Sequence, residues 1–352
     1  MRIEQIPEQF MNFVVGNKLI DLMNLSLMYN ISVDDIYNLL KENDIPVIEN
    51  SIEEQSFYIE IKNLPEDFND IIDDFKDQSR SEGEDQMYKF IESLGVKVIP
   101  NDRKAIFPKE LDMYMPDNKV GIEYDGLYWH KETSLVEKTD ICDDKGIRLI
   151  RFYEDEWNKK RRICKGLISS ALNIYEQEIK LKDCKITEIS ELQYKQFLKN
   201  NHIHGNAESL YRYGLVYDDE LVYAIGIKEY DDYYILNRIC PKIGVHVQKA
   251  LEKLLKHFHK ENEDITELYT YADRRTQNLQ FYEHAGFELI KTMPCEYFYI
   301  VRGQRIGKFD GDDAVKLLKK KYKPSKTEEQ NLHDNGYDKI YDCGSYKMKI
   351  TF

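Results

Sequence analysis

Residues 110–115 read Glu-Leu-Asp-Met-Tyr-Met, and residues 121–130 read Gly-Ile-Glu-Tyr-Asp-Gly-Leu-Tyr-Trp-His. Apolar and polar residues alternate in both stretches, which is typical of β-strands. The alternation places Glu123 and Asp125 on one face of the second strand. Asp112 lies in an otherwise apolar strand, where an unpaired carboxylate is costly. A divalent cation would explain why carboxylates gather here, and so would an arginine partner; both interpretations stay open at this point.

The segments around these strands alternate between helix and strand patterns, which predicts a mixed sheet flanked by helices. In chain order we expect helix 84–94, strands 96–99, 110–115 and 120–126, helix 135–146, strand 147–153 and helix 154–175. Gly146 is suited to end the helix before it, because a helix commonly stops at a glycine. The whole segment reads as one domain, residues 81–181.

Residues 182–310 form a second α/β pattern, with a hairpin expected to turn at Asp218-Asp219. We expect strand 184–189, helix 191–201, hairpin 211–229, strand 233–239, helix 245–262, strand 267–272, helix 278–286 and strand 296–300. The remaining segment, 311–352, contains a basic amphipathic helix at 312–322 and a strand pair around 336–350. The predicted fold class is therefore α/β, or α+β, and multidomain.

Residues 1–80 predict a helical domain. Two short helices at 19–30 and 33–45 are separated by a break, with Ser32 as a suitable N-cap, and a strand-like stretch follows at 56–61. The outline resembles a helix-turn-helix, but this segment holds 17 acidic and 6 basic side chains. That charge is unfavourable for a phosphate surface, so a protein-docking or structural role remains an alternative.

Composition narrows the class of protein. The 352 residues are 42% hydrophobic and 32% charged with a net charge of −14, which is typical of a globular protein rather than a disordered one. No stretch is apolar enough to span a membrane, and no secretion signal begins the chain. The six cysteines are widely spaced, which excludes CxxC zinc pairs and a dense disulfide framework. We therefore expect a cytoplasmic protein, in the host cell if it is phage-encoded.

The central motifs resemble the PD-(D/E)XK nuclease superfamily, in its very-short-patch-repair branch, and the phage homing endonucleases built on that core. The resemblance rests on Glu84, Asp112, Glu123-x-Asp125, and the runs at 126–130 and 145–157. It continues into residues 197–205, 271–287 and 336–344. It implies a Mg²⁺-dependent DNA endonuclease that hydrolyses phosphodiester bonds, with double-stranded DNA as partner, no membrane partner, and a homodimer left open.

By that resemblance, Asp112 would be the principal Mg²⁺ ligand, with Glu84 and Asp125 beside it, and Glu123 would take the acidic place of the motif. His130 would act as general base or general acid, because imidazole titrates near neutral pH. Leu135 stands where relatives often carry histidine, so Glu137 or Asp140 would orient His130 instead.

Other residues are candidates for DNA contacts. Trp129 would stack on a base or pack in the core. Lys138, Arg148 and the basic run 159–162, which includes Arg161 and Arg162, would meet phosphates or form a solvated face. Further candidates are Arg274, Arg275 and the His-Ile-His-Gly run at 202–205.

Residues 278–290 resemble the late helix and strand of the GNAT acetyltransferase fold. In that family an acyl-CoA site needs successive backbone N–H groups in a glycine-rich loop at a helix N-terminus. The corresponding stretch, 240–255, has one glycine, Gly244, and lacks the RxxGxG pattern. The resemblance therefore implies a GNAT-like fold in which acyl-CoA is not an expected partner, and we expect the domain to act in DNA targeting.

Three functions remain open after the sequence is read. The main prediction is the endonuclease. The second is an acyl-CoA N-acyltransferase that carries a degenerate nuclease domain. The third is a catalytically inactive regulator that binds DNA or protein.

Overall fold

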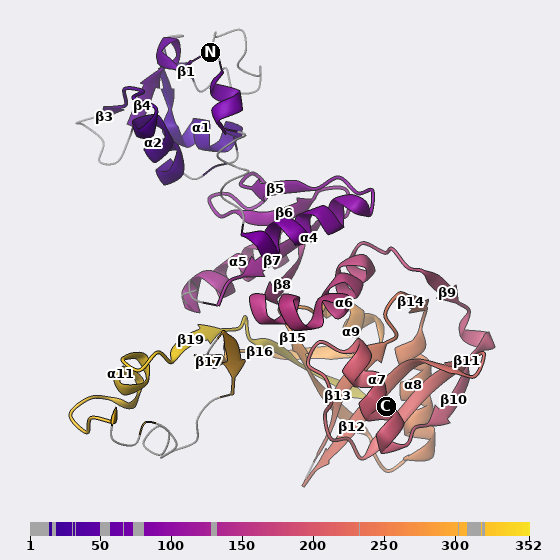
Figure 1. Ribbon diagram of the computed structural model, residues 1–352. Helices are drawn as coiled ribbons and strands as arrows, with labels where there is room; N and C mark the ends of the chain where they lie inside the picture. The colour runs from indigo at the N-terminus through magenta and orange to yellow at the C-terminus, as the bar shows by residue number, and fades with distance from the viewer. Residues whose placement is uncertain are drawn as a thin grey trace. The chain divides into compact units, whose positions relative to one another are not determined.

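The computed structural model describes residues 14–15, 19–29, 31, 33–49, 57–65, 67–72, 81–127, 132–231, 233–301, 303–307, 318 and 321–352. The chain divides into two compact units, Met1–Pro116 and Asp117–Phe352 (Figure 1). Each unit combines helices with β-sheet, which confirms the predicted α/β multidomain class. The domain boundaries drawn after residues 80, 181 and 310 stay predictions.

The first unit contains a four-stranded antiparallel sheet of order β1-β2-β4-β3. Its strands are β1 (Val14–Val15), β2 (Leu19–Asp21), β3 (Ile48–Glu49) and β4 (Phe57–Glu60), and η3 (Ile61–Asn63) follows. Helices α1 (Leu22–Tyr29) and α2 (Val33–Glu42) lie between β2 and β3 in the chain, and α2 buries Ile36, Leu39 and Leu40. The sequence predicted both helices and β4, whereas the other strands are too short for alternation to show. Ser32 lies outside the described residues.

The same unit continues with α4 (Glu82–Ser93), β5 (Ile99–Asp102) and β6 (Leu111–Met115). The side chain of Ser81 caps α4 by accepting a hydrogen bond from the Glu84 N–H at 3.2 Å. Strands β5 and β6 pair antiparallel, with Ile99 opposite Tyr114. The predicted helix and the predicted strand 110–115 are both present.

The second unit opens with the parallel pair β7 (Val120–Asp125) and β8 (Arg148–Tyr153). Parallel neighbours need a crossover, and α5 (Glu132–Asp144) supplies it. Helix α6 (Glu154–Ala171) follows β8 directly, and Glu156 accepts a hydrogen bond from the Tyr153 N–H at its start. This order agrees with the one predicted for residues 120–175.

A seven-stranded sheet of order β10-β11-β12-β13-β15-β20-β16 makes up most of the second unit. Its strands are β10 (Lys185–Glu188), β11 (Tyr211–Tyr217), β12 (Glu220–Tyr230), β13 (Tyr233–Pro241), β15 (Glu267–Asp273), β16 (Glu288–Met293) and β20 (Ser345–Thr351). The predicted turn at Asp218-Asp219 is present, with positive φ at both residues. Only β13 and β15 run parallel, and they pair at just two positions, Ile235 with Tyr269 and Leu236 with Thr270.

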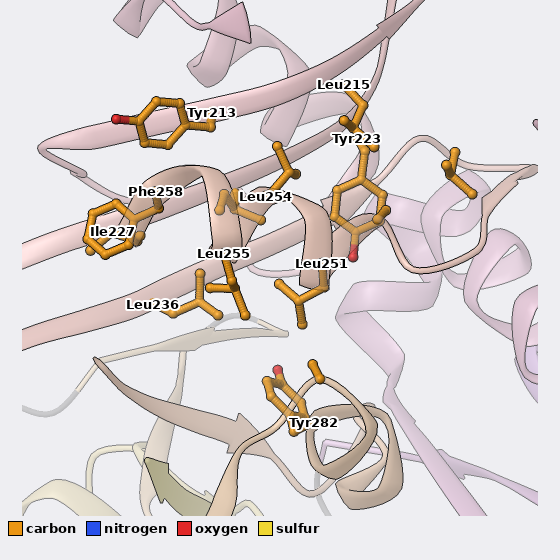
Figure 2. Packing of buried hydrophobic residues seen from close by; sticks show 14 of the residues in the cluster. Tyr213, Leu215, Tyr223, Ile227, Leu236, Leu251, Leu254, Leu255, Phe258 and Tyr282 are labelled. Carbon is orange, nitrogen blue, oxygen red and sulfur yellow. The ribbon is translucent and has the colours of Figure 1, made fainter. Parts of the chain in front are cut away.

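Helices cover both faces of this sheet. On β12, Tyr223 and Ile225 pack with α8 (Ala250–Glu261), whereas Ala224 packs with α7 (Glu191–Asn201). Because successive side chains of a strand point to opposite faces, the two helices lie on opposite sides. Figure 2 shows the α8 side, where Leu251, Leu254, Leu255 and Phe258 meet the strands.

One predicted helix near this core differs from the structure. The helix predicted over 245–262 is a short strand, β14 (Val245–Val247), followed by α8, which begins at Ala250. Strand β14 pairs in parallel with β9 (Gln177–Ile179). Lys249 has a φ of 59°, a conformation that a helix interior does not allow, so the helix starts after it. The 3₁₀ turn η4 (Leu181–Asp183) joins β9 to β10.

The predicted C-terminal strand pair is divided between two sheets. Strand β19 (Asp338–Tyr341) pairs with β17 (Tyr297–Val301), which also pairs with β18 (Gln304–Ile306). Strand β20 instead enters the large sheet between β15 and β16. The short helices α9 (Leu279–His284) and α11 (Glu328–His333) complete the described elements. Most of the predicted basic helix 312–322 lies outside them.

No helix within the described part of the chain has the length and apolar character needed to cross a membrane.

Replacing Leu254 by alanine should lower the free energy of unfolding by about 2–5 kcal/mol, because its side chain is fully buried under the sheet. The matched control is Leu192→Ala on α7, where the leucine is 77% exposed and we expect a change below about 0.5 kcal/mol. Urea denaturation of both variants measures the difference. Equal losses would show that α8 does not form the core of this sheet.

Candidate functional site

The carboxylates predicted on β7 are buried and paired with cations. Asp125 accepts hydrogen bonds from Arg151 Nε at 2.9 Å and from Arg151 Nη2 at 2.6 Å, one on each carboxylate oxygen. Glu123 accepts from Lys138 Nζ at 2.5 Å and lies 3.5 Å from Arg151 Nη2. Burial alone would lower the pKa of the Arg151 guanidinium, but Asp125 and Glu123 outweigh burial and raise it. The arginine-partner interpretation of these carboxylates therefore describes the structure.

Of the other residues predicted for the metal site, two belong to the first unit and two are outside the described residues. Glu84 on α4 and Asp112 on β6 belong to the first unit, whereas Glu123 and Asp125 belong to the second. Trp129 and His130 lie outside the described residues. Within the described residues, no three His, Cys, Asp or Glu side chains form a group that could hold a metal ion.

The arginines predicted to contact DNA divide into an exposed pair and a buried pair. Arg161 and Arg162 are exposed on α6, and Arg162 Nη1 donates to the Asn200 carbonyl at 3.2 Å. Arg274 is buried and donates to Asp140 at 2.6 Å and to Asp143 at 2.8 Å. DNA binding by these residues and by Lys138 stays a prediction.

Arg275, also buried, sits between β15 and α9 and bonds to three different segments. Its guanidinium donates to Glu156 at 3.0 and 3.2 Å, and its backbone N–H donates to Asp273 Oδ1 at 2.9 Å. Its carbonyl accepts a hydrogen bond from the Arg151 N–H at 2.8 Å. Arg305, in β18, also reaches Glu156, at 2.8 Å. We call Glu156, Asp273, Arg275 and Arg305 the arginine cluster.

The arginine cluster keeps its carboxylates ionised. Burial favours the neutral form of Glu156, but Arg275 and Arg305 outweigh it and lower the pKa of Glu156 to about 2. Asp273 is affected in the same way: burial opposes its ionisation, while Arg275 and the hydrogen bond from His204 hold its pKa below the ordinary value. Both groups are therefore negatively charged at neutral pH.

His204 and Asp273 form a pair that opens to solvent. His204 Nε2 lies 2.9 Å from Asp273 Oδ2, and about a third of the histidine side chain is exposed. Because Asp273 is ionised and can only accept, the proton of neutral His204 is on Nε2, which leaves Nδ1 as an acceptor. His202, which accepts from the His204 N–H at 3.1 Å, is buried, and burial lowers its pKa well below the ordinary value. His202 is therefore neutral.

This pair lines one cavity, which shares residues with a second, larger cavity. The smaller, about 230 Å³, lies where β13 and β15 cease to pair and is lined by residues of both strands and by His204 and Asp273. The larger, about 670 Å³, is lined by the end of β13, the segment 242–249, the first turn of α8, and α9. Four residues line both cavities: His202, Ile239, Gln277 and Tyr282. The two spaces therefore meet at these side chains.

Tyr282 stands at the junction of the cavities, below α8 in Figure 2. Its hydroxyl donates to Gln277 Oε1 at 2.8 Å, and the same oxygen accepts the Asp273 N–H at 2.9 Å. Burial raises the pKa of the Tyr282 hydroxyl above its ordinary value, so the hydroxyl stays protonated.

The segment before α8 is closed by backbone pairing. The Gly244 carbonyl accepts from the Glu176 N–H at 2.8 Å and from the Gln177 N–H at 3.1 Å, and β14 continues the pairing with β9. The Val245 N–H donates to the Lys242 carbonyl at 3.1 Å. Gly244 has a φ of +78°, and a Cβ there would lie 2.7 Å from Glu176 Cδ. This stretch is thus a paired strand rather than an open glycine-rich loop.

Comparison with known proteins gives structural matches alone. No protein-family model matches the chain, and no curated protein matches it. A PaiA N-acetyltransferase from Thermoplasma acidophilum, in complex with coenzyme A, is 15% identical, with a TM-score of 0.23 over 40% of this chain and 60% of that one. This chain thus spans less than two thirds of that protein. An IAA acetyltransferase from Bacillus cereus is 13% identical, with a TM-score of 0.30 over 48% of this chain and 99% of that one.

A third match is the ribosomal-protein-S18-alanine N-acetyltransferase from Escherichia coli. It is 12% identical, with a TM-score of 0.29 over 48% of this chain and 93% of that one. At these TM-scores the likeness is remote. All three are acetyltransferases.

The predicted Mg²⁺-dependent endonuclease is wrong. The structural matches described above are transferases rather than nucleases, and nothing in the comparisons supports a nuclease or a phage homing enzyme. The predicted cofactor Mg²⁺ is wrong as well. Asp125, one of its three predicted ligands, has both oxygens bound to Arg151, and Lys138 neutralises Glu123, so these donors do not suit a cation. The sequence placed the carboxylates correctly on one strand but could not show which cations fold against them.

Sequence reasoning missed the pair that matters most in this site. It noted His204 within a run of DNA-contact candidates, and it gave Asp273 no role. The two residues are 69 positions apart, so no local spacing joins them. The one signal in the sequence was the strand pattern at 267–272, which is followed directly by Asp-Arg-Arg at 273–275.

Changing Glu156 to glutamine should lower the free energy of unfolding at pH 7 by about 3–5 kcal/mol, because Arg275 and Arg305 would then face a neutral amide. The pKa of Glu156 is depressed on folding, so its stabilisation is present above about pH 4.5 and is lost as the pH falls toward about 2. The difference between wild type and variant should therefore shrink over that range. Denaturant titration at several pH values measures it.

The matched control is Glu178→Gln, an exposed glutamate on β9. It should unfold like the wild type at every pH. A Glu156→Gln protein with wild-type stability at pH 7 would contradict the role given to the arginine cluster.

Proposed function

We propose that this chain is an acyl-CoA N-acyltransferase, the second function that the sequence left open. One observation carries the proposal. The larger cavity lies along residues 239–252, where the GNAT resemblance puts the acyl-CoA site, and it meets the smaller cavity that holds the His204–Asp273 pair. A donor and an acceptor bound in the two spaces would meet at the shared wall.

The larger cavity suits an acyl-CoA in size and lining. Its volume falls within the usual range for ligand sites, about 300–1,000 Å³. Apolar residues line part of it, among them Ile239 of β13 and Val245 of β14. Basic residues, Arg148 and Lys249 among them, line the same cavity. A bound acyl thioester would supply an activated acyl group to an amine.

His204 is the residue placed to activate the acceptor amine. An amine must be unprotonated to attack, and it must lose a further proton as the amide forms. Ionised Asp273 holds the proton of His204 on Nε2, so Nδ1 is the nitrogen that accepts a proton. The imidazolium that results is stabilised by the same carboxylate.

Tyr282 is the residue placed to act as an acid. It lines both cavities, and its hydroxyl remains protonated because burial raises its pKa. A protonated hydroxyl can donate a hydrogen bond to sulfur as a thiolate leaves. Base and acid would then come from different segments, His204 from the turn after α7 and Tyr282 from α9.

Changing His204 to alanine should lower kcat/KM for acyl transfer by a factor on the order of 10²–10⁴, the usual loss for a general base. Release of free CoA thiol from acetyl-CoA, measured with a panel of small amines and peptide N-termini, provides the assay. His333→Ala, on the exposed helix α11, is the matched control and should retain full activity.

Calorimetry with acetyl-CoA tests the proposal without a known acceptor. We expect binding to the wild type and to His204→Ala alike, because the histidine lines the smaller cavity and not the larger one. Failure of the wild type to bind acetyl-CoA would overturn the acyltransferase proposal.

A further inference from the structure

Among the described residues that line the larger cavity, only Arg148 has a buried side-chain donor without a hydrogen-bond partner. Its Nε is shielded from solvent and has no hydrogen-bond partner. An unsatisfied buried donor is destabilising, and more so when it belongs to a charged group. Burial also lowers the pKa of this guanidinium. A ligand oxygen in the cavity would relieve this cost.

The position of Arg148 is fixed by backbone pairing. It is the first residue of β8, it stands opposite Val120 of β7, and its N–H donates to the Lys119 carbonyl at 2.9 Å. Strand β8 lies outside the seven-stranded sheet, so Arg148 reaches the cavity from a different part of the unit than β13 and α8 do.

The charged side chains that line the larger cavity are mainly basic. They are Arg148, Lys242, Lys249 and Glu252. Lys242 is already paired with Glu220 at 2.6 Å. The remaining charges are those of Arg148, Lys249 and Glu252, two positive and one negative. The lining of the cavity therefore carries a net positive charge, which attracts an anion.

Strand β14 offers an anion little, because it is paired with β9 and the Val245 N–H is bonded to the Lys242 carbonyl. A side chain on the cavity wall can hold the charge of an anionic ligand. A planar guanidinium suits phosphate, since it can donate two parallel hydrogen bonds. Close by, the rings of Tyr175 and His246 stack at 4.6 Å and line the same space.

We propose that Arg148 binds a phosphate group of the ligand in the larger cavity. For an acyl-CoA this would be a phosphate of its nucleotide end, and that identification rests on the proposed function. Phosphate recognition then comes from β8, outside the GNAT-like sheet.

Calorimetric titration of full-length protein with three probes tests this: coenzyme A, ADP and pantetheine, which lacks phosphate. Arg148→Gln should lower the affinity for coenzyme A and for ADP on the order of 10- to 100-fold and change the affinity for pantetheine by less than about twofold. Arg148→Lys keeps the positive charge but loses the planar group that donates two parallel hydrogen bonds, so its affinity for coenzyme A and ADP should lie between those of the wild type and Arg148→Gln. It also serves as the test variant if Arg148→Gln does not fold. Arg161→Gln, an exposed arginine on α6, is the matched control and should bind all probes as the wild type does.

The outcomes separate this inference from the proposed function. If the wild type binds ADP through Arg148 but binds neither coenzyme A nor pantetheine, the phosphate site stands and the acyltransferase proposal fails. If coenzyme A binds the wild type and both Arg148 variants equally, the inference is overturned while the acyltransferase proposal stands. If neither coenzyme A nor ADP binds the wild type, the phosphate site is overturned too.

Discussion

The hydrogen bonds of Arg275 connect three segments of the second unit. From one position after β15, this residue holds Asp273 through its N–H, Glu156 of α6 through its guanidinium, and the Arg151 N–H of β8 through its carbonyl. A buried guanidinium without such partners would cost several kcal/mol, so the segments that supply them are bound to each other. Arg305 shares Glu156 and lies 3.8 Å above the Tyr153 ring, which adds the β17–β19 sheet to the same assembly. The candidate base His204 is held through Asp273 by this cluster.

The short parallel pairing of β13 and β15 gives the site its location. Backbone hydrogen bonds close a sheet, and where they stop, space opens between neighbouring strands. Here only Ile235 with Tyr269 and Leu236 with Thr270 are paired, and Leu236 and Thr270 line the smaller cavity. The proposed chemistry therefore takes place where the ladder between β13 and β15 ends.

Local patterns predicted most of the elements, because alternation and helical periodicity are properties of neighbouring residues. The hairpin at Asp218-Asp219, helix α7 and the β7–α5–β8 order all follow from such patterns. Long-range choices were not predictable in this way. Nothing near Asp125 indicates that Arg151 rather than a metal would bind it, and nothing near His204 points to Asp273. The turn at Lys249 that shortens α8 depends on pairing with β9, which is about seventy residues earlier in the chain.

Strand β20 lies between β15 and β16, although the β17–β19 sheet and α11 separate it from β16 in the chain. During translation, β15 and β16 leave the ribosome well before residues 345–351 are made. Until then each has an open edge, and an open edge readily recruits another strand. The large sheet can therefore close only after residues 345–351 have been made, and pairing at such long separation is slow. A nascent chain of this protein should consequently be a good substrate for chaperones that shield exposed strands.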